Sequence, residues 1–298
     1  MAAVDDLLLR LARIDTVVDE AAKSSGVTSP ELIDHALRGV AVQGLSSFEQ
    51  FLRDRGSEWA AHLTQARISA ATLSGGTLAF SDRIIQTLPR RFRDLDDGQR
   101  STLVEELALT MTSFSSGNLV GHDLFFAWSG SNIQPSDVEG IVKLVGLKGW
   151  GDLTAAWKVL DPRFPGNSSA EKIMKDFSSQ RHTYAHQVDA SINPMAVSTI
   201  TRNVRLTAML LDMVVSAALQ HIARGSAVPN GVGSSLTMRQ ITRDGSVWSE
   251  FPPSKTRALK RHASLQDALI AATPRARAND EVIVVFDQSE IVDWRAAI

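Results

Sequence analysis

Residues 207–219 read TAMLLDMVVSAAL, a run of apolar and small side chains in which Asp212 carries the only charge. The run is shorter than the roughly 20 apolar residues that a membrane-spanning helix needs, and Asp212 interrupts it. It therefore predicts a buried helix in a folded core. Apolar residues continue on both sides, so we expect one long helix over 195–224 at the centre of the fold.

Helical spacing of apolar residues also extends from this segment toward the N-terminus. Ser136 with Glu139, and Ser168 with Glu171, have the spacing of capping boxes and predict the starts of two helices. Ser29-Pro30 predicts a third start, because proline is favoured in the first helical turn. The expected helices cover 4–22, 30–52, 59–73, 82–88, 99–112, 136–145, 153–159 and 170–188. The fold class is therefore mainly α.

The pattern changes after Gly225. The stretches 236–241 and 246–251 flank an Asp244-Gly245 pair and predict a β-hairpin. Ser264 with Asp267 predicts a helix to about residue 272, and the run over 281–286 predicts a buried strand. The glycines and proline of 225–233 are typical of a linker. We therefore expect a helical domain over 1–225, with 1–24 as an accessory helix, and a small C-terminal α+β appendage over 234–298.

Composition narrows the function classes. The chain has 298 residues, 44% of them hydrophobic and 21% charged, with a formal net charge of −2, which is typical of an ordinary soluble protein. The absence of cysteine excludes disulfides, thiolate metal sites and cysteine nucleophiles. Asp5 and Asp6 stand where a secretory or mitochondrial signal would carry basic residues. We therefore expect a cytoplasmic protein without a membrane partner.

Several enzyme signatures are missing from the sequence. It contains no glycine-rich phosphate loop of either common pattern and no Gly-x-Ser-x-Gly nucleophile elbow. The seven histidines include no His-Glu-x-x-His helix motif. The expected cofactor set is therefore empty, and no metal site is predicted.

One stretch does collect groups that carry phosphodiester chemistry. Residues 180–187 read QRHTYAHQ and hold a guanidinium, two imidazoles and the chain's only tyrosine. Histidine titrates near neutral pH, so it can remove a proton from a ribose 2′-hydroxyl or return one to a leaving oxygen. Arginine presents a permanent charge to phosphoryl oxygens. These residue types are those that metal-independent RNA cleavage requires.

The string Arg181-His182-x-x-x-His186 resembles the Arg-polar-x-x-x-His signature of the HEPN superfamily, the helical-bundle ribonucleases of prokaryotic toxins and anti-phage systems. The setting is similar too, because the motif ends a late helix that a long apolar helix follows. The likeness is greatest to the RiboL-PSP-HEPN branch and covers roughly residues 30–224. This chain departs from that branch's Arg-Asn-x-Ile-Ala-His-Gly at His182, Tyr184 and Gln187.

The resemblance implies a HEPN-like helical bundle and a metal-independent endoribonuclease that acts on RNA as a homodimer. It implies Arg181, His186 and His182 as catalytic residues. An early helix over 45–52 matches the family helix that carries a polar residue toward the site, which makes Glu49 a catalytic candidate and Arg53 a substrate-binding one. Such enzymes serve as toxins or defence effectors, so an antitoxin or regulatory protein is an expected partner.

Helix geometry leaves alternatives open. Residues five apart lie about 140° around the axis, so Arg181 and His186 do not share a helix face, whereas His182 and His186 do. The alternative to a catalytic role for Arg181 and His186 is that they simply lie at a solvated helix terminus. Glu49 has the alternatives of an ordinary surface carboxylate or of a partner of Arg53 through helix spacing. Tyr184 either binds substrate or packs in the bundle.

A basic patch in the appendage is the remaining candidate. Arg257, Lys260 and Arg261 exceed the nearby acids, and Trp248 lies close in sequence, so the patch is a candidate for binding an RNA backbone. The alternative is a solvated face. For the whole chain, the alternative function is a catalytically inactive HEPN scaffold that binds RNA or a protein.

Overall fold

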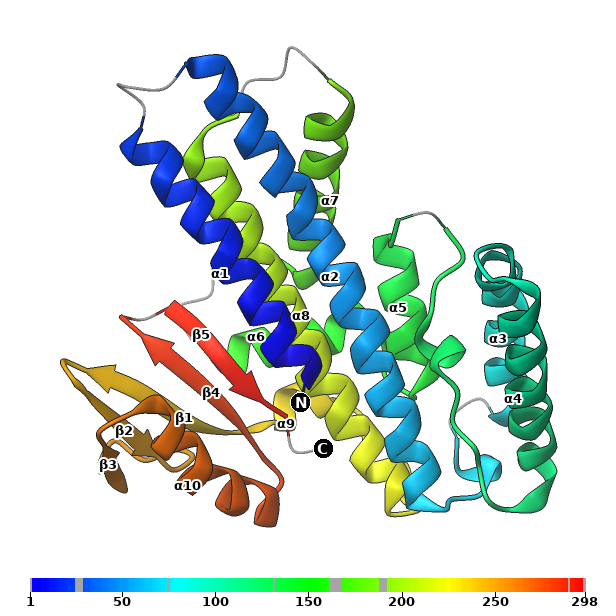
Figure 1. Cartoon of the computed structure of the whole chain (residues 1–298). Coiled ribbons are helices and arrows are strands. Elements are labelled where there is room, and N and C mark those ends of the chain that lie inside the picture. Colours follow the sequence, from blue (N-terminus) through cyan, green and yellow to red (C-terminus); the bar gives the residue numbers. More distant parts are fainter. Residues whose placement is uncertain are drawn as a thin grey trace.

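The apolar run 207–219 lies in α8 (Pro194–Ala223), at the centre of the long helices of the bundle (Figure 1). The computed structural model describes residues 2–24, 29–73, 76–130, 132–160, 168–187, 192–288 and 290–296. Among these, α8 is the one helix long and apolar enough to cross a membrane by length and composition, but 72% of its most apolar window is buried in the fold. The helix predicted over 195–224 is thus confirmed with bounds shifted by one residue, and its burial is that of a core helix.

Two long helices run beside α8, namely α1 (Ala2–Lys23) and α2 (Pro30–Ala66) (Figure 1). Helix α1 confirms the helix predicted over 4–22. Helix α2 corrects the prediction of two separate helices, since it continues for 37 residues and ends where Arg67 turns left-handed at φ 51°. Its polar middle does not break it, because Arg55 is buried there and pairs with Asp212 of α8.

The remaining helices of the bundle flank this trio (Figure 1). They are η1 (Ala70–Thr72), α3 (Gly76–Arg93), α4 (Asp97–Ser116), η2 (Asp123–Phe126), α5 (Pro135–Leu144), α6 (Trp150–Leu160) and α7 (Ala170–His186). Each predicted helix over 82–112 and 136–159 is present, with longer bounds in every case except the slightly shifted α5. The mainly α fold class is therefore confirmed.

Two predicted caps lie one or two residues from their true positions. Helix α5 begins after Gln134, whose side chain forms a capping box with Asp137, because Pro135 already fits the first helical position. Ser136 is therefore inside the helix. Helix α7 is capped by Ser169, which accepts a hydrogen bond from the Lys172 backbone N–H at 3.1 Å, and not by Ser168. It ends at His186, and the predicted end at residue 188 lies outside the described residues.

The C-terminal part forms one five-stranded sheet in the order β3-β2-β1-β4-β5. Strands β1 and β4 are parallel and the other neighbours are antiparallel. The elements are α9 (Val232–Ser235), β1 (Thr237–Asp244), β2 (Val247–Phe251), β3 (Lys260–His262), α10 (Leu265–Ala278), β4 (Glu281–Asp287) and β5 (Glu290–Arg295). The hairpin turn is Gly245-Ser246, since Asp244 still pairs with Val247. Strands β3 and β5 were not predicted from the sequence.

The sheet is buried on both faces, as the apolar run of β4 predicts. Ile283 and Val285 pack with α10, while Val282 and Val284 join the main core of the helical bundle. The segment predicted as a linker ends in a packed turn, because a Cβ on Gly233 would lie 1.9 Å from the Asp152 carbonyl oxygen. The appendage is therefore seated on the bundle, and its division into a separate domain stays a prediction.

Asp212 connects three parts of the fold, namely α8, α2 and the sheet. Its carboxylate is fully buried, and Oδ1 accepts hydrogen bonds from Arg55 Nε of α2 at 2.7 Å and from Ser216 Oγ at 2.9 Å. Its Oδ2 accepts from Trp294 Nε1 of β5 at 2.9 Å. One carboxylate therefore connects α8 with α2 and with the sheet.

We expect the Asp212→Ala variant to lose about 3–5 kcal/mol of unfolding free energy, because it leaves the buried Arg55 charge without its main partner. Asp212→Asn keeps an oxygen that accepts from Trp294 and should lose less. Urea unfolding followed by circular dichroism measures both values. A loss below about 1 kcal/mol for the alanine variant would show that this carboxylate does not hold the parts together.

A second buried carboxylate, that of Asp293 in β5, makes the unfolding free energy depend on pH. Asp293 is 6% exposed, and burial raises its pKa to about 6 even though the Arg295 charge opposes the shift. Between about pH 4 and 6 the carboxyl is protonated in the folded chain and ionised in the unfolded one. The folded state is therefore penalised progressively as pH rises through this window.

We expect the unfolding free energy of the wild type to fall relative to that of Asp293→Asn by up to about 3 kcal/mol between pH 4 and 7. Most of the change should occur below pH 6, because the group is ionised in both states above it. Parallel urea titrations of the two proteins measure this difference. Curves that stay parallel across the window would contradict the raised pKa.

Candidate functional site

The C-terminal half of α7 carries the motif residues at an open end of the bundle. Ala170, Met174 and Phe177 form the buried face of the helix, and the Phe177 ring packs edge-on against Phe48 of α2 with centroids 5.8 Å apart. This packing fixes which way the last turns point. Arg181 is half-buried, whereas His182 and His186 are exposed.

Arg181 and His182 line one groove of about 310 Å³. The groove lies between α7, α2 and the start of α5, and its lining also includes Leu45, Gln134, Lys175 and Ser178. No described residue accepts a hydrogen bond from the Arg181 guanidinium or pairs with its charge. Arg181 thus presents an unshared positive charge to this concave surface, whereas the Lys175 ammonium that lines it is paired with Glu171.

His186 lies next to the groove without lining it. Its ring centroid is 4.8 Å from that of His182, with the two planes tilted by 54°. The spacing of four residues places both rings on one side of α7, as expected from helix geometry. The structure therefore brings together three of the predicted catalytic residues, with Arg181 and His182 facing the cavity and His186 beside them.

Glu49 has a different environment from the one predicted. Its side chain is buried, and Oε1 accepts a hydrogen bond from the Ile133 backbone N–H at 2.8 Å. The alternative of a surface carboxylate is therefore wrong. Glu49 is not in the groove lining but holds the segment that supplies Asn132 and Gln134 to it. Its place one turn after Leu45 on the buried face of α2 was the sequence signal for this role.

The predicted substrate-binding residues do not converge on α7. Tyr184 is half-buried and packs against the main core, which agrees with the packing alternative. Arg257, Lys260 and Arg261 are exposed at or before β3, an edge strand of the sheet far from the open end of α7 (Figure 1). The basic patch is thus a separate surface.

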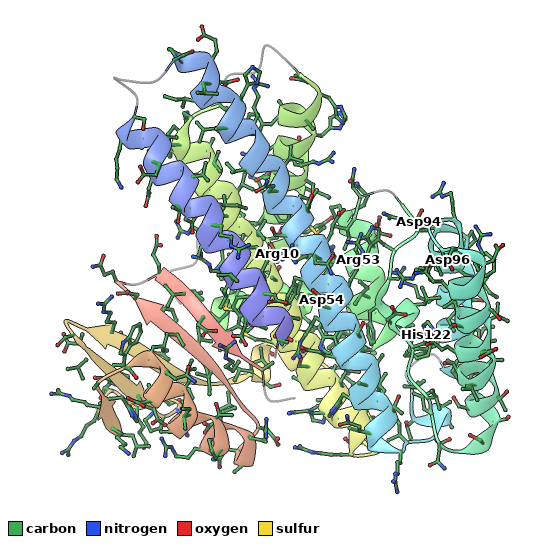
Figure 2. The ribbon with its side chains drawn as sticks, viewed as in Figure 1. Arg10, Arg53, Asp54, Asp94, Asp96 and His122 are labelled. Atoms are coloured by element: carbon green, nitrogen blue, oxygen red, sulfur yellow. The ribbon has the colours of Figure 1, made fainter. Side chains whose placement is uncertain are left out.

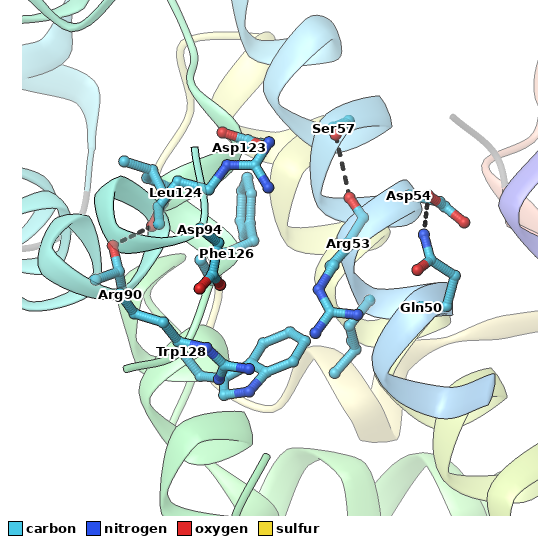
Figure 3. A pocket seen from close by; sticks show the side chains of 14 residues that line it. Gln50, Arg53, Asp54, Ser57, Arg90, Asp94, Asp123, Leu124, Phe126 and Trp128 are labelled. Carbon is cyan, nitrogen blue, oxygen red and sulfur yellow. Dashed lines mark hydrogen bonds between the residues drawn. The ribbon is translucent and has the colours of Figure 1, made fainter. Parts of the chain in front are cut away.

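Arg53 lies in a second cavity, of about 370 Å³, between α2, α3 and η2 (Figure 3). Figure 2 shows Arg53 and Asp54 on α2, with Asp94 and His122 on the neighbouring segments. Arg90, Arg91 and Trp128 also line this cavity, and the sequence analysis missed the two arginines. Trp128 follows η2 in an irregular segment and is 4% exposed.

Comparisons with family models, with curated proteins and with solved structures find no match for this chain. The described residues contain no group of three or more His, Cys, Asp or Glu side chains placed to hold a metal ion. The groups available for chemistry in the groove are Arg181, Lys175 and His182, with His186 beside them.

We expect Glu49→Ala to loosen the segment that forms one wall of the groove. The Ile133 N–H loses its buried acceptor, a change of about 1–3 kcal/mol, so its hydrogen exchange should become roughly ten- to hundredfold faster. Glu49→Gln keeps an acceptor oxygen and serves as the control. Unchanged protection of Ile133 in the alanine variant would show that the carboxylate does not hold this wall.

Proposed function

We propose that this chain is a metal-independent endoribonuclease whose active groove is formed by the C-terminal half of α7. The observation that carries the proposal is the shared groove of Arg181 and His182, with the His186 ring 4.8 Å from that of His182. The groove combines permanent positive charge with an imidazole, the side chain that most often transfers protons in general acid–base catalysis. The likeness of these residues to the HEPN motif supports the same activity.

The groups have distinct roles in this reaction. Arg181 and Lys175 bind the non-bridging oxygens of a phosphodiester, whose charge grows in the transition state. One imidazole takes the proton of the ribose 2′-hydroxyl as the bond from the 2′-oxygen to phosphorus forms. The bond to the 5′-oxygen breaks, and a second imidazole donates a proton to that oxygen. The products are a 2′,3′-cyclic phosphate and a 5′-hydroxyl.

A single chain supplies only one side of such a site. Attacking and leaving oxygens lie on opposite sides of the phosphorus in an in-line displacement. The rings of His182 and His186 lie close together on one face of α7, so they approach the phosphorus from one side only. A second copy of α7 across a two-fold axis would supply the other side, which is why we propose a homodimer as the active form.

We also propose a cytoplasmic toxin or anti-phage defence effector as the biological setting. The support is the HEPN likeness. A general ribonuclease would damage its own cell, so a neutralising antitoxin or regulatory protein belongs to this proposal.

The test is cleavage of single-stranded RNA in EDTA by the wild type and by the Arg181→Ala and His186→Ala variants. Each variant should lose at least about a hundredfold in rate, because general acid–base groups contribute about 10²–10⁴-fold. Arg277→Ala and His221→Ala remove the same residue types far from α7 and should cleave like the wild type. Enzymatic end analysis should find 2′,3′-cyclic phosphates.

The same experiment also tests the dimer. The rate per chain should fall when the protein is diluted below the dimer dissociation constant measured by sedimentation. Equal cleavage by wild type and His186→Ala would refute the assignment. A folded wild type that cleaves no RNA would favour the alternative of an inactive scaffold.

A further inference from the structure

The cavity between α2, α3 and η2 contains three arginines that the proposed nuclease site does not use. Arg53 comes from α2, and Arg90 and Arg91 come from the last turn of α3 (Figure 3). The cavity of about 370 Å³ has the size of a small-molecule site. It is distinct from the α7 groove, because the two cavities have no lining residue in common.

Trp128 fixes two of these arginines in place. The Arg53 guanidinium carbon is 4.7 Å from the centroid of the indole, and that of Arg90 is 5.7 Å from the same centroid. Both distances are within the range of cation–π contacts. The indole is itself buried, so its position is set by packing. Two positive charges are thereby held around one rigid ring before any ligand binds.

The acids around the cavity have partners of their own. Asp54 accepts a hydrogen bond from Gln50 Nε2 at 2.8 Å. The Asp123 carboxylate lies 2.9 Å from His122 Nδ1, and that of Asp94 lies 4.0 Å from Arg93 Nε. None of the three forms an ion pair with the arginines that line the cavity.

Arg53 and Arg91 therefore form no salt bridge with these acids. Neither guanidinium forms a salt bridge or donates a hydrogen bond to a described residue, although Glu49 and Asp54 act on Arg53, and Asp123 on Arg91, at longer range. Burial lowers the pKa of Arg53, Glu49 opposes this, and the charges of Arg90 and Arg91 lower the pKa further. The arginines repel one another, so an anion that bridges them would be stabilised by all three.

We propose that this cavity binds a phosphoryl group, with Arg53, Arg90 and Arg91 as its ligands. Planar guanidinium forks match the oxygens of a phosphomonoester, and three of them surround its three terminal oxygens. The remaining volume accommodates part of the molecule that carries the phosphate. The ligand is therefore a small phosphomonoester such as a mononucleotide, or the 5′-phosphate of an RNA strand.

Isothermal titration calorimetry tests this site with uridine 5′-monophosphate, inorganic phosphate and uridine as probes. Both phosphates should bind saturably and uridine should not. Arg53→Ala, Arg90→Ala and Arg91→Ala should each weaken the binding of uridine 5′-monophosphate about tenfold or more, since each removes charge-assisted hydrogen bonds. Arg93→Ala removes an equal charge from the same helix end outside the cavity and should leave the affinity unchanged.

Competition with hexauridylate, with and without a 5′-phosphate, distinguishes a small phosphomonoester from an RNA end as the ligand. Displacement of the mononucleotide only by the 5′-phosphorylated hexamer identifies an RNA end as the ligand, and no displacement by either hexamer identifies a small phosphomonoester. His186→Ala should bind the mononucleotide like the wild type, so this binding site is tested independently of the nuclease activity. The proposal is overturned if the phosphates show no saturable binding at millimolar concentration, or if Arg93→Ala weakens binding as much as Arg53→Ala does.

Discussion

The buried carboxylate of Asp212 constrains the whole arrangement. A charge fully removed from water is tolerated only when it is paired and hydrogen-bonded, and Asp212 meets this condition with Arg55 of α2, Ser216 of α8 and Trp294 of β5. Moving the sheet away from the bundle would leave Oδ2 of Asp212 and the Trp294 indole N–H without their hydrogen bond to each other. The same charge therefore sets the position of α2 along α8 and the seat of the appendage.

With α2 held in this way, its successive turns determine both cavities. Leu45 lines the groove on α7, Arg53 lines the cavity beside α3, and Glu49 between them binds the Ile133 backbone N–H. These positions are four residues apart, so they follow one side of the helix. Glu49 thus fastens a segment that runs between the two concave surfaces.

Local signals in the sequence predicted α1, α7, α8 and the mainly α class, because apolar spacing and helix stops depend on nearby residues. They failed where the deciding partner is far along the chain. Arg55 keeps α2 continuous through Asp212, 157 residues away, and Glu49 is buried by Ile133, 84 residues away. Strands β3 and β5 depend on pairing with β2 and β4. The convergence of Arg90 and Trp128 depends likewise on how α3 and η2 pack.

The two cavities differ in the chemistry that their side chains allow. The α7 groove combines Arg181 with His182, so it has both a fixed charge for an anion and an imidazole, a residue type used for proton transfer. The described lining of the other cavity has arginines and carboxylates but no histidine, and its nearest imidazole, His122, is buried and faces Asp123. Guanidinium groups remain protonated in proteins, so they hold a phosphate without transferring a proton to it. On this physical ground, we propose catalysis in the first cavity and binding alone in the second.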